Sequence, residues 1–170
     1  MAFWLMKSEP SVYGIDDLQR DGQTSWGGVR NYQVRNMFRD DFAVGDEAFF
    51  YHSSCVEPGI VGTMVVTSNA FPDSAQFDRK SEYFDARSSR ESPTWLAVDV
   101  RHKRRFASPI LLETLRGRGE LAELLILRRG NRLSVIPVTP AEWRCVLSMA
   151  APGQERLQTR SPRSNRPGRA

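Results

Sequence analysis

The chain has 170 residues, of which 40% are hydrophobic, and this length and composition suit one ordinary globular core. Its formal net charge of +4 comes from the last 20 residues, which carry five arginines and one acid, Glu155, so the 24 basic and 20 acidic residues of the whole chain leave 19 of each in residues 1–150. The composition of the folded part therefore does not imply a strongly basic nucleic-acid-binding face.

The sequence gives no sign of a membrane or secreted protein. No apolar run approaches the roughly 20 residues of a membrane helix, and MAFWLMKSEP lacks the features of a secretion signal. Cys55 and Cys145 lie far apart and form no CxxC motif, so we expect reduced thiols in a cytoplasmic protein. The composition predicts a folded domain over residues 1–150 and a disordered Arg-, Pro- and Ser-rich tail over residues 151–170, with only weak attraction to polyanions.

Strands and short helices are mixed in the first half of the chain. Ile15 and Leu18 predict a short helix that ends at an Asp-Gly pair, and Val34, Met37 and Phe38 share one face of a second helix. Runs of apolar and aromatic residues predict strands over residues 3–7, 47–53 and 59–68, of which the last two pair. Residues 69–92 are polar, and we expect a long excursion that packs on the barrel.

The second half begins with an alternating strand over residues 95–105. Ser108 and Pro109 then predict the start of a helix, and a second helix is expected after Gly119. Residues 131–138 predict a strand whose Pro137 suits an end or an edge. Thr139 to Glu142 form a capping box with proline at the first helical position, which predicts a last helix to about Ala150. The absence of a regular βαβ rhythm favours an α+β class with a small barrel.

Catalytic and metal-binding patterns are absent from the sequence. It contains only two histidines, His52 and His102, and no HExxH, GxSxG, P-loop or GxGxxG motif. Cys55 and His52 could form a nucleophile and base, but nothing marks a third group that would orient the base. We therefore expect no catalytic residue, no metal site and no cofactor.

Aromatic and polar side chains gather at predicted strand ends and in the glycine-containing loop SWGGVRNYQ at residues 25–33. A flat heterocycle suits such a set, because stacking on an aromatic ring contributes about 1 to 3 kcal/mol per base while polar groups read the base edge. Each aromatic residue taken alone is more readily a core residue, and only the combination favours a binding site. The set comprises Trp4, Ser8, Trp26, Asn31, Tyr51, His52, Ser53, Trp95 and Ser134.

Eight segments, in this order, resemble the EVE-domain family: FWLMKSEP, IDDL, WGGVRNYQVRN, GDEAFFYHSS, GIVGTMVV, FPDSAQFD, WLAVDVR and NRLSVIPVTPAEW. The similarity covers about residues 2–149. It implies an α+β fold of the PUA-like group, a small mixed β-barrel flanked by helices and related to YTH, ASCH and PUA modules. In that group an aromatic pocket takes a base flipped out of a nucleic acid, and EVE modules are associated with modified bases, particularly 5-methylcytosine and its oxidised forms in DNA.

The resemblance implies a base site built from the turn after the first strand, the Trp26 to Asn31 loop, the end of the strand at residues 51–53 and the strand around residue 134. The expected base-binding residues are Trp26, Asn31, Ser8, Glu9, Tyr51, His52, Ser53 and Ser134. Trp26 would form one wall, and Asn31 would either cap the following helix or read the base. Where the family pattern leads us to expect an acid after this tryptophan, the chain has Gly27.

The expected activity is non-catalytic binding of DNA or RNA through a flipped, modified base, by a protein expected to be monomeric. Two alternatives stay open from the sequence. One is an enzyme that acts on a nucleotide or RNA with His52 or Glu9 as acid or base, and the other is an interaction scaffold whose pocket has lost its ligand.

Overall fold

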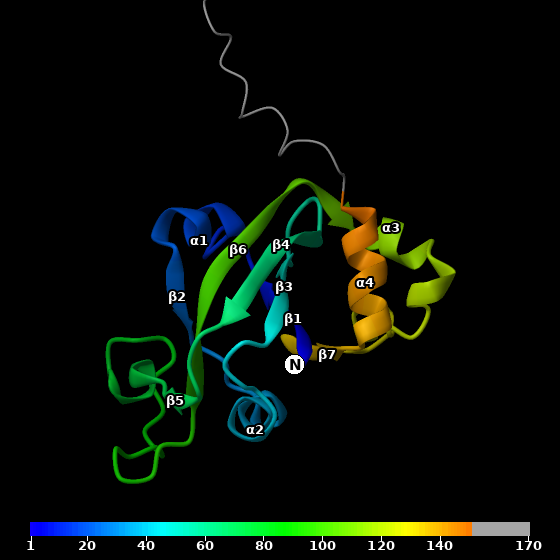
Figure 1. Cartoon of the computed structure of the whole chain (residues 1–170). Coiled ribbons are helices and arrows are strands. Elements are labelled where there is room, and N and C mark those ends of the chain that lie inside the picture. The colour runs from blue at the N-terminus through cyan, green and yellow to red at the C-terminus, as the bar shows by residue number, and fades with distance from the viewer. Residues whose placement is uncertain (151–170) are drawn as a thin grey trace, which may run out of the picture.

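The computed structural model describes residues 1–150 (Figure 1). The predicted tail, residues 151–170, lies outside the described residues. Within residues 1–150, a mixed sheet is combined with four α-helices, as expected for an α+β fold. None of the helices in this part of the chain has the length and apolar character needed to cross a bilayer.

The sheet has seven strands, and six of them lie side by side in the order β2-β6-β4-β3-β1-β7, with β5 paired to β6. β1 and β3 are parallel, and the other neighbours are antiparallel. β7 is an outer strand, which agrees with the edge position predicted from Pro137. The strands are β1 (Phe3–Ser8), β2 (Gln23–Trp26), β3 (Glu47–His52), β4 (Gly59–Val66), β5 (Phe71–Pro72), β6 (Leu96–Leu111) and β7 (Val135–Val138).

The predicted helix starts at Asn31 and Thr139 are both confirmed. The Asn31 side chain accepts a hydrogen bond from the Val34 amide, and Thr139 forms a reciprocal capping box with Glu142. Figure 1 shows the sheet in the middle of the molecule, with α1 to its left, α2 below it, and α3 and α4 to its right. The helices are α1 (Ile15–Asp21), α2 (Tyr32–Asp40), α3 (Leu112–Arg116) and α4 (Pro140–Met149).

Alternate residues of the central strands enter two separate hydrophobic clusters. Trp4 and Met6 of β1 and Phe50 of β3 belong to the cluster shared with α1 and α2. Leu5 and Phe49, their neighbours in sequence, belong to the cluster shared with α3 and α4. The side-chain period of two therefore buries both faces of these strands, and each face has its own helical cover.

The helix predicted in SPILLETLR is present as α3, but its predicted start at Ser108 and Pro109 is wrong, because β6 continues to Leu111 and α3 begins at Leu112. Pro109 is tolerated there because the β4–β6 register skips between Arg105 and Ile110, so this proline interrupts no regular ladder pair. The backbones of β4 and β6 approach each other closely in this irregular region. This approach requires glycine at position 62, since a Cβ atom there would lie 2.2 Å from the Arg104 carbonyl oxygen. The helix predicted after Gly119 is also wrong, and two short 3-10 turns, Gly119–Leu121 and Leu125–Leu127, take its place.

The excursion predicted at residues 69–92 packs on the sheet through one buried glutamine. Gln76, fully buried, donates to the Trp95 carbonyl at 2.8 Å and accepts from the Trp95 amide at 2.9 Å. Its oxygen also accepts from the Ser88 hydroxyl and the Thr94 amide. These bonds hold the two ends of the excursion together, beside the loop that follows β2.

Candidate nucleic-acid interface

Four of the eight predicted site residues meet at one end of the sheet. Ser8 at the end of β1 is paired with His52 at the end of β3. The Ser53 amide donates to the Ser8 carbonyl at 3.0 Å, and the Lys7 amide donates to the Ser134 carbonyl at 2.8 Å. Since β1 and β3 are parallel, their carboxyl ends lie at the same edge and bring these residues together.

Two polar side chains at this edge are engaged in holding the fold. The Ser8 hydroxyl donates to the Tyr13 carbonyl at 2.6 Å, which fixes the turn after β1. His52 Nε2 accepts from the Ile15 amide at 3.1 Å, at the first residue of α1. Burial lowers the pKa of His52, which favours the neutral ring that can accept this hydrogen bond. The proton of the neutral imidazole then resides on Nδ1.

Two predicted aromatic site residues are buried in different parts of the core. Trp26 is 8% exposed and contacts Phe50 edge to face, with 5.3 Å between ring centroids. Tyr51 is 3% exposed and belongs to the other cluster, which faces α3 and α4. The structure therefore does not bring Tyr51 to the same side as Trp26, because adjacent residues of a strand point to opposite faces. Nor is the Trp26 indole presented to solvent as an open stacking face.

Asn31 performs the helix-capping role that the sequence allowed. Its Oδ1 atom accepts from the Val34 amide at 3.1 Å, while the residue itself remains exposed. Within residues 1–150, no hydrogen bond engages its Nδ2 group. Capping therefore leaves the amide donors of Asn31 available to a ligand.

Asp73 braces the loop between Trp26 and Asn31. Its carboxylate accepts from the Gly28 amide at 2.8 Å and pairs with Arg30 at 2.9 Å. Burial of this carboxyl raises its pKa, but the hydrogen bonds from Gly28, Arg30 and Ala75 outweigh that effect and leave the pKa below its usual range. A Cβ atom at Gly27 would lie 3.1 Å from the same carboxylate, so the side chain of an acidic residue at position 27 would start next to the Asp73 carboxylate.

Tyr83 covers the glycine loop from the other side. A Cβ atom at Gly28 would lie only 2.9 Å from the Tyr83 ring, and Gly28 also has a positive φ of 73°, so both space and backbone require glycine. Arg30 donates to the Tyr83 carbonyl at 2.8 Å and lies 5.3 Å from the centre of its ring. Burial raises the pKa of Tyr83, and the nearby carboxylates of Glu82 and Glu9 raise it further.

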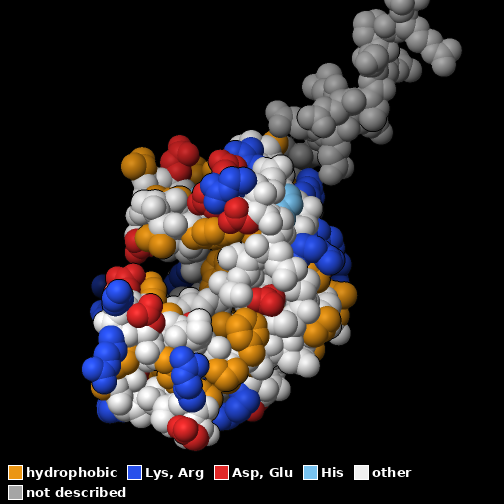
Figure 2. Space-filling model, turned by 90° about the vertical axis from the view of Figure 1, so that its left-hand side faces the viewer, with side chains coloured by type: hydrophobic (Ala, Val, Ile, Leu, Met, Phe, Trp, Pro, Cys, Tyr) orange, Lys and Arg blue, Asp and Glu red, His pale blue; other side chains and the backbone are white. Residues whose placement is uncertain are grey.

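The turn after β1 and the segment containing Tyr83 flank a depression in the surface. Figure 2 shows a hollow between the part of the molecule that carries α1 and the part formed by residues 71–94. Glu9, Asn31 and Tyr83 are all exposed, and the Tyr83 ring packs against Gly28 of the glycine loop. This arrangement combines an aromatic ring with hydrogen-bond donors and a carboxylate acceptor, which suits a planar heterocycle.

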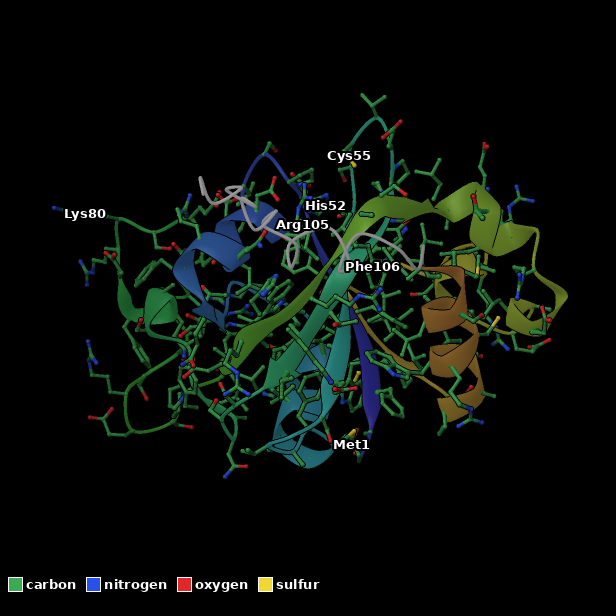
Figure 3. All side chains as sticks on the ribbon, turned by 45° about the horizontal axis from the view of Figure 1, so that its top comes forward. Met1, His52, Cys55, Lys80, Arg105 and Phe106 are labelled. Atoms are coloured by element: carbon green, nitrogen blue, oxygen red, sulfur yellow. The ribbon has the colours of Figure 1, made fainter. Side chains whose placement is uncertain are left out.

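A cavity of about 120 Å³ lies beside His52. Asp16, Arg105 and Phe106 contribute to its wall, and Arg105 pairs with Asp16 at 2.6 Å. Figure 3 shows His52, Arg105 and Phe106 close together at this end of the sheet. Neither Trp26 nor Ser134 lines this cavity, so it is separate from the glycine loop. Among residues 1–150, no cluster of three or more His, Cys, Asp or Glu side chains is arranged to hold a metal ion.

Sequence reasoning missed the residues that organise the glycine loop. Asp73 lies 43 positions from Arg30, and the Tyr83 carbonyl lies 53 positions away. The segment FPDSAQFD, which contains Asp73 and Gln76, belongs to the family pattern, but this pattern does not indicate what either side chain does. Their contacts depend on how the excursion folds back, which local spacing does not show.

Comparison with known proteins gives the same family over nearly the whole described chain. The EVE domain family model matches residues 2–149. Thymocyte nuclear protein 1 of Homo sapiens is 39% identical over 165 residues, covering 86% of this chain and 72% of that protein. The Danio rerio protein of the same name is 41% identical, covering 86% of this chain and 71% of its own length.

Solved structures agree with this assignment. A Pseudomonas putida protein has a TM-score of 0.85 and 45% identity, covering 88% of this chain and 100% of that chain. Human THYN1 protein, solved in complex with 5-methylcytosine containing DNA, has a TM-score of 0.82 and 38% identity, covering 88% and 98%. An ASCH protein of Zymomonas mobilis, at 12% identity and a TM-score of 0.54, shares the fold alone. The family model and these relatives together show that the chain belongs to the EVE-domain family.

Proposed function

We propose that this protein is a non-catalytic DNA-binding module that recognises a modified base, such as 5-methylcytosine, flipped out of the strand. The observation that carries the proposal is the similarity to human THYN1 protein, whose structure contains 5-methylcytosine DNA and which this chain matches over 98% of that chain's length. The hollow beside the glycine loop supports the same function, because its exposed groups suit one planar base.

We place the base in the hollow beside Tyr83 and the glycine loop, with Glu9 and the amide of Asn31 at its edge. Ser8, His52, Ser53 and Ser134 would shape the adjoining end of the sheet, where their backbone contacts already fix the turn after β1. Trp26 would support the glycine loop from the hydrophobic core, where its ring contacts Phe50. Tyr51 has no part in this arrangement, since it faces α3 and α4.

We infer binding without chemistry. The alternative enzyme would use His52 or Glu9 as acid or base, but His52 Nε2 already accepts from the Ile15 amide. A general base must be within hydrogen-bond reach of the proton it removes, and this nitrogen would have to release α1 first. The use of His52 as a structural acceptor therefore argues against an enzyme that uses His52 as acid or base.

The proposal extends to the fold and the setting. We infer that the sheet curves into the small barrel of the PUA-like group. Two observations support this inference: the central strands are covered on both faces, and the ASCH protein shares the fold. We propose DNA rather than RNA as the main partner, a monomer, and a cytoplasmic location. The DNA preference rests on the human THYN1 complex.

The proposal can be tested with short single strands that carry one cytosine or one 5-methylcytosine, in DNA and RNA, followed by tryptophan fluorescence. Burial of one methyl group contributes about 1 kcal/mol, so we expect roughly fivefold tighter binding of the methylated DNA strand. The recovered oligonucleotides should keep their mass. Equal affinity for both bases would overturn the reader assignment, and a changed mass would support the enzyme.

A further inference from the structure

A second hollow, larger than the cavity beside His52, lies between α2 and the strand segments around β5 and the start of β6. Its volume is about 380 Å³. Phe38, Phe42 and Leu96 form an apolar floor, while Arg35, Arg39 and Thr94 line the polar side. Figure 1 shows α2 beneath the sheet, beside the segment that carries β5. We call this hollow the α2 groove.

The α2 groove has a positive rim and no acidic lining residue. Arg35 and Arg39 are four positions apart in α2, so their side chains lie on the same face of the helix. Arg35 contacts only neutral oxygen acceptors, Asn36 Oδ1 at 2.9 Å and the Thr94 carbonyl at 3.4 Å. Among residues 1–150, Arg35 has no carboxylate within ion-pair distance.

Arg39 on this rim pairs with Asp40 at 2.8 Å. Both side chains of the pair are 54% exposed, and exposed ion pairs between neighbouring residues contribute little free energy. Arg39 can therefore exchange Asp40 for a phosphate at small cost. The rim offers two guanidinium groups, one turn apart, to an anionic ligand.

A row of stacked cationic and aromatic groups joins the α2 groove to the glycine loop. Arg30, which also covers Tyr83, lies 5.5 Å from the centre of the Trp95 ring. Tyr32 lies against Trp95 with 4.8 Å between ring centroids, and Arg35 lies 5.1 Å from the centre of the Tyr32 ring. Tyr32 is 54% exposed and Trp95 is 4% exposed, so the row is open to solvent at Tyr32 and is backed by the buried Trp95 ring. One chain of nucleotides could follow it from the base site into the groove.

We propose that the α2 groove binds a nucleotide next to the flipped base. Arg35 and Arg39 would hold consecutive phosphates, and the sugar and base would lie over Phe38, Phe42 and Leu96. This inference rests on the proposed function and adds a second contact region to it. Phosphate contacts position a strand without reading its sequence, so the groove contributes affinity and register while the base site contributes selectivity.

The test uses single-stranded DNA with one 5-methylcytosine and zero to four thymidines added on the 5′ or the 3′ side, measured by fluorescence anisotropy at several salt concentrations. Wild-type protein should gain affinity from the first added nucleotides on one side. The double variant Arg35→Gln, Arg39→Gln should lose this gain, and its log Kd against log salt slope should be shallower by about 0.7 for each phosphate that the protein no longer binds. The affinity ratio between methylated and unmodified strands should stay unchanged.

Arg144→Gln provides the matched control, because Arg144 is an exposed arginine on α4, which packs on the other face of the sheet. Arg39→Gln alone, at an exposed helix position, serves if the double variant melts early. If the wild type distinguishes methylated DNA but the Arg35 and Arg39 variants behave like Arg144→Gln, the groove has another occupant and the inference is overturned. If the wild type does not distinguish the two strands, the proposed function itself fails.

Discussion

Asp73 is the residue on which the glycine loop depends most, because one buried carboxylate serves Gly28, Ala75 and Arg30. Asp73→Asn keeps the shape but removes the charge opposite Arg30. Hydrogen bonds to charged groups contribute about 1.5 to 3 kcal/mol, so we expect the free energy of unfolding in urea to fall by roughly that amount. Asp41→Asn, at an exposed helix end, is the control. An unchanged urea midpoint for Asp73→Asn would show that the loop is held by other contacts.

Asn31 combines a structural role with a proposed binding role, and two substitutions separate them. Asn31→Ala should lower the free energy of unfolding by about 1 kcal/mol, because the α2 cap is removed, whereas Asn31→Ser keeps an acceptor for the Val34 amide. Both variants lack the amide donor, so both should bind 5-methylcytosine DNA about 2- to 13-fold more weakly. If Asn31→Ser binds 5-methylcytosine DNA with wild-type affinity, Asn31 only caps α2 and does not contact the base.

At the scale of elements, His52 couples the end of β3 to the start of α1. Its folded-state pKa is lowered by burial, so the neutral ring stabilises the fold above the ordinary histidine pKa of about 6.5, and this contribution is lost as pH falls through the folded-state value. His52→Gln keeps an acceptor near Ile15 without titrating. We expect its unfolding free energy to fall less steeply than that of the wild type as the pH falls below about 6.5.

His102 must be compared in the same experiment, since burial also lowers its pKa and it therefore contributes with the same sign. His102→Gln removes that second contribution while the contact between His52 and Ile15 remains. Parallel pH profiles of wild type and His52→Gln would mean that the His52 ring does not titrate differently in the folded and unfolded protein.

Elements with local end signals could be predicted from the sequence, and those shaped by pairing could not. Asn31 and Thr139 mark helix starts through bonds to residues three positions away, which the sequence displays directly. Ser108 and Pro109 show an equally good helix signal, yet they lie in β6 because β4 supplies a partner strand with an irregular register. Local propensity was overridden there by tertiary pairing.

The same distinction applies to the site across the whole molecule. The meeting of Ser8, His52, Ser53 and Ser134 follows from strand ends, and the family pattern indicated those segments. The opposite orientation of Tyr51 follows from the alternation along β3, which the sequence also contains. The bracing of the glycine loop by Asp73 and Tyr83, in contrast, depends on the return path of residues 69–94, and no residue spacing reveals that path.

Charge is distributed unevenly over the molecule, and this leads to a prediction about the tail. Residues 1–150 are formally neutral, whereas residues 151–170 carry five arginines and one acid. Removing residues 151–170 should therefore weaken binding to DNA and flatten its salt dependence, by up to about 0.7 in log–log slope for each arginine that contacts a phosphate of a single strand.

The preference for 5-methylcytosine over cytosine should survive this truncation, because the tail lies outside the base site proposed within residues 1–150 and phosphate contacts carry no information about the base. The measurement is the salt dependence of Kd for full-length and truncated protein on the same methylated and unmodified strands. A truncated protein with the full-length slope would show that the arginines make no phosphate contact. Loss of the base preference on truncation would instead place part of the base recognition in residues 151–170.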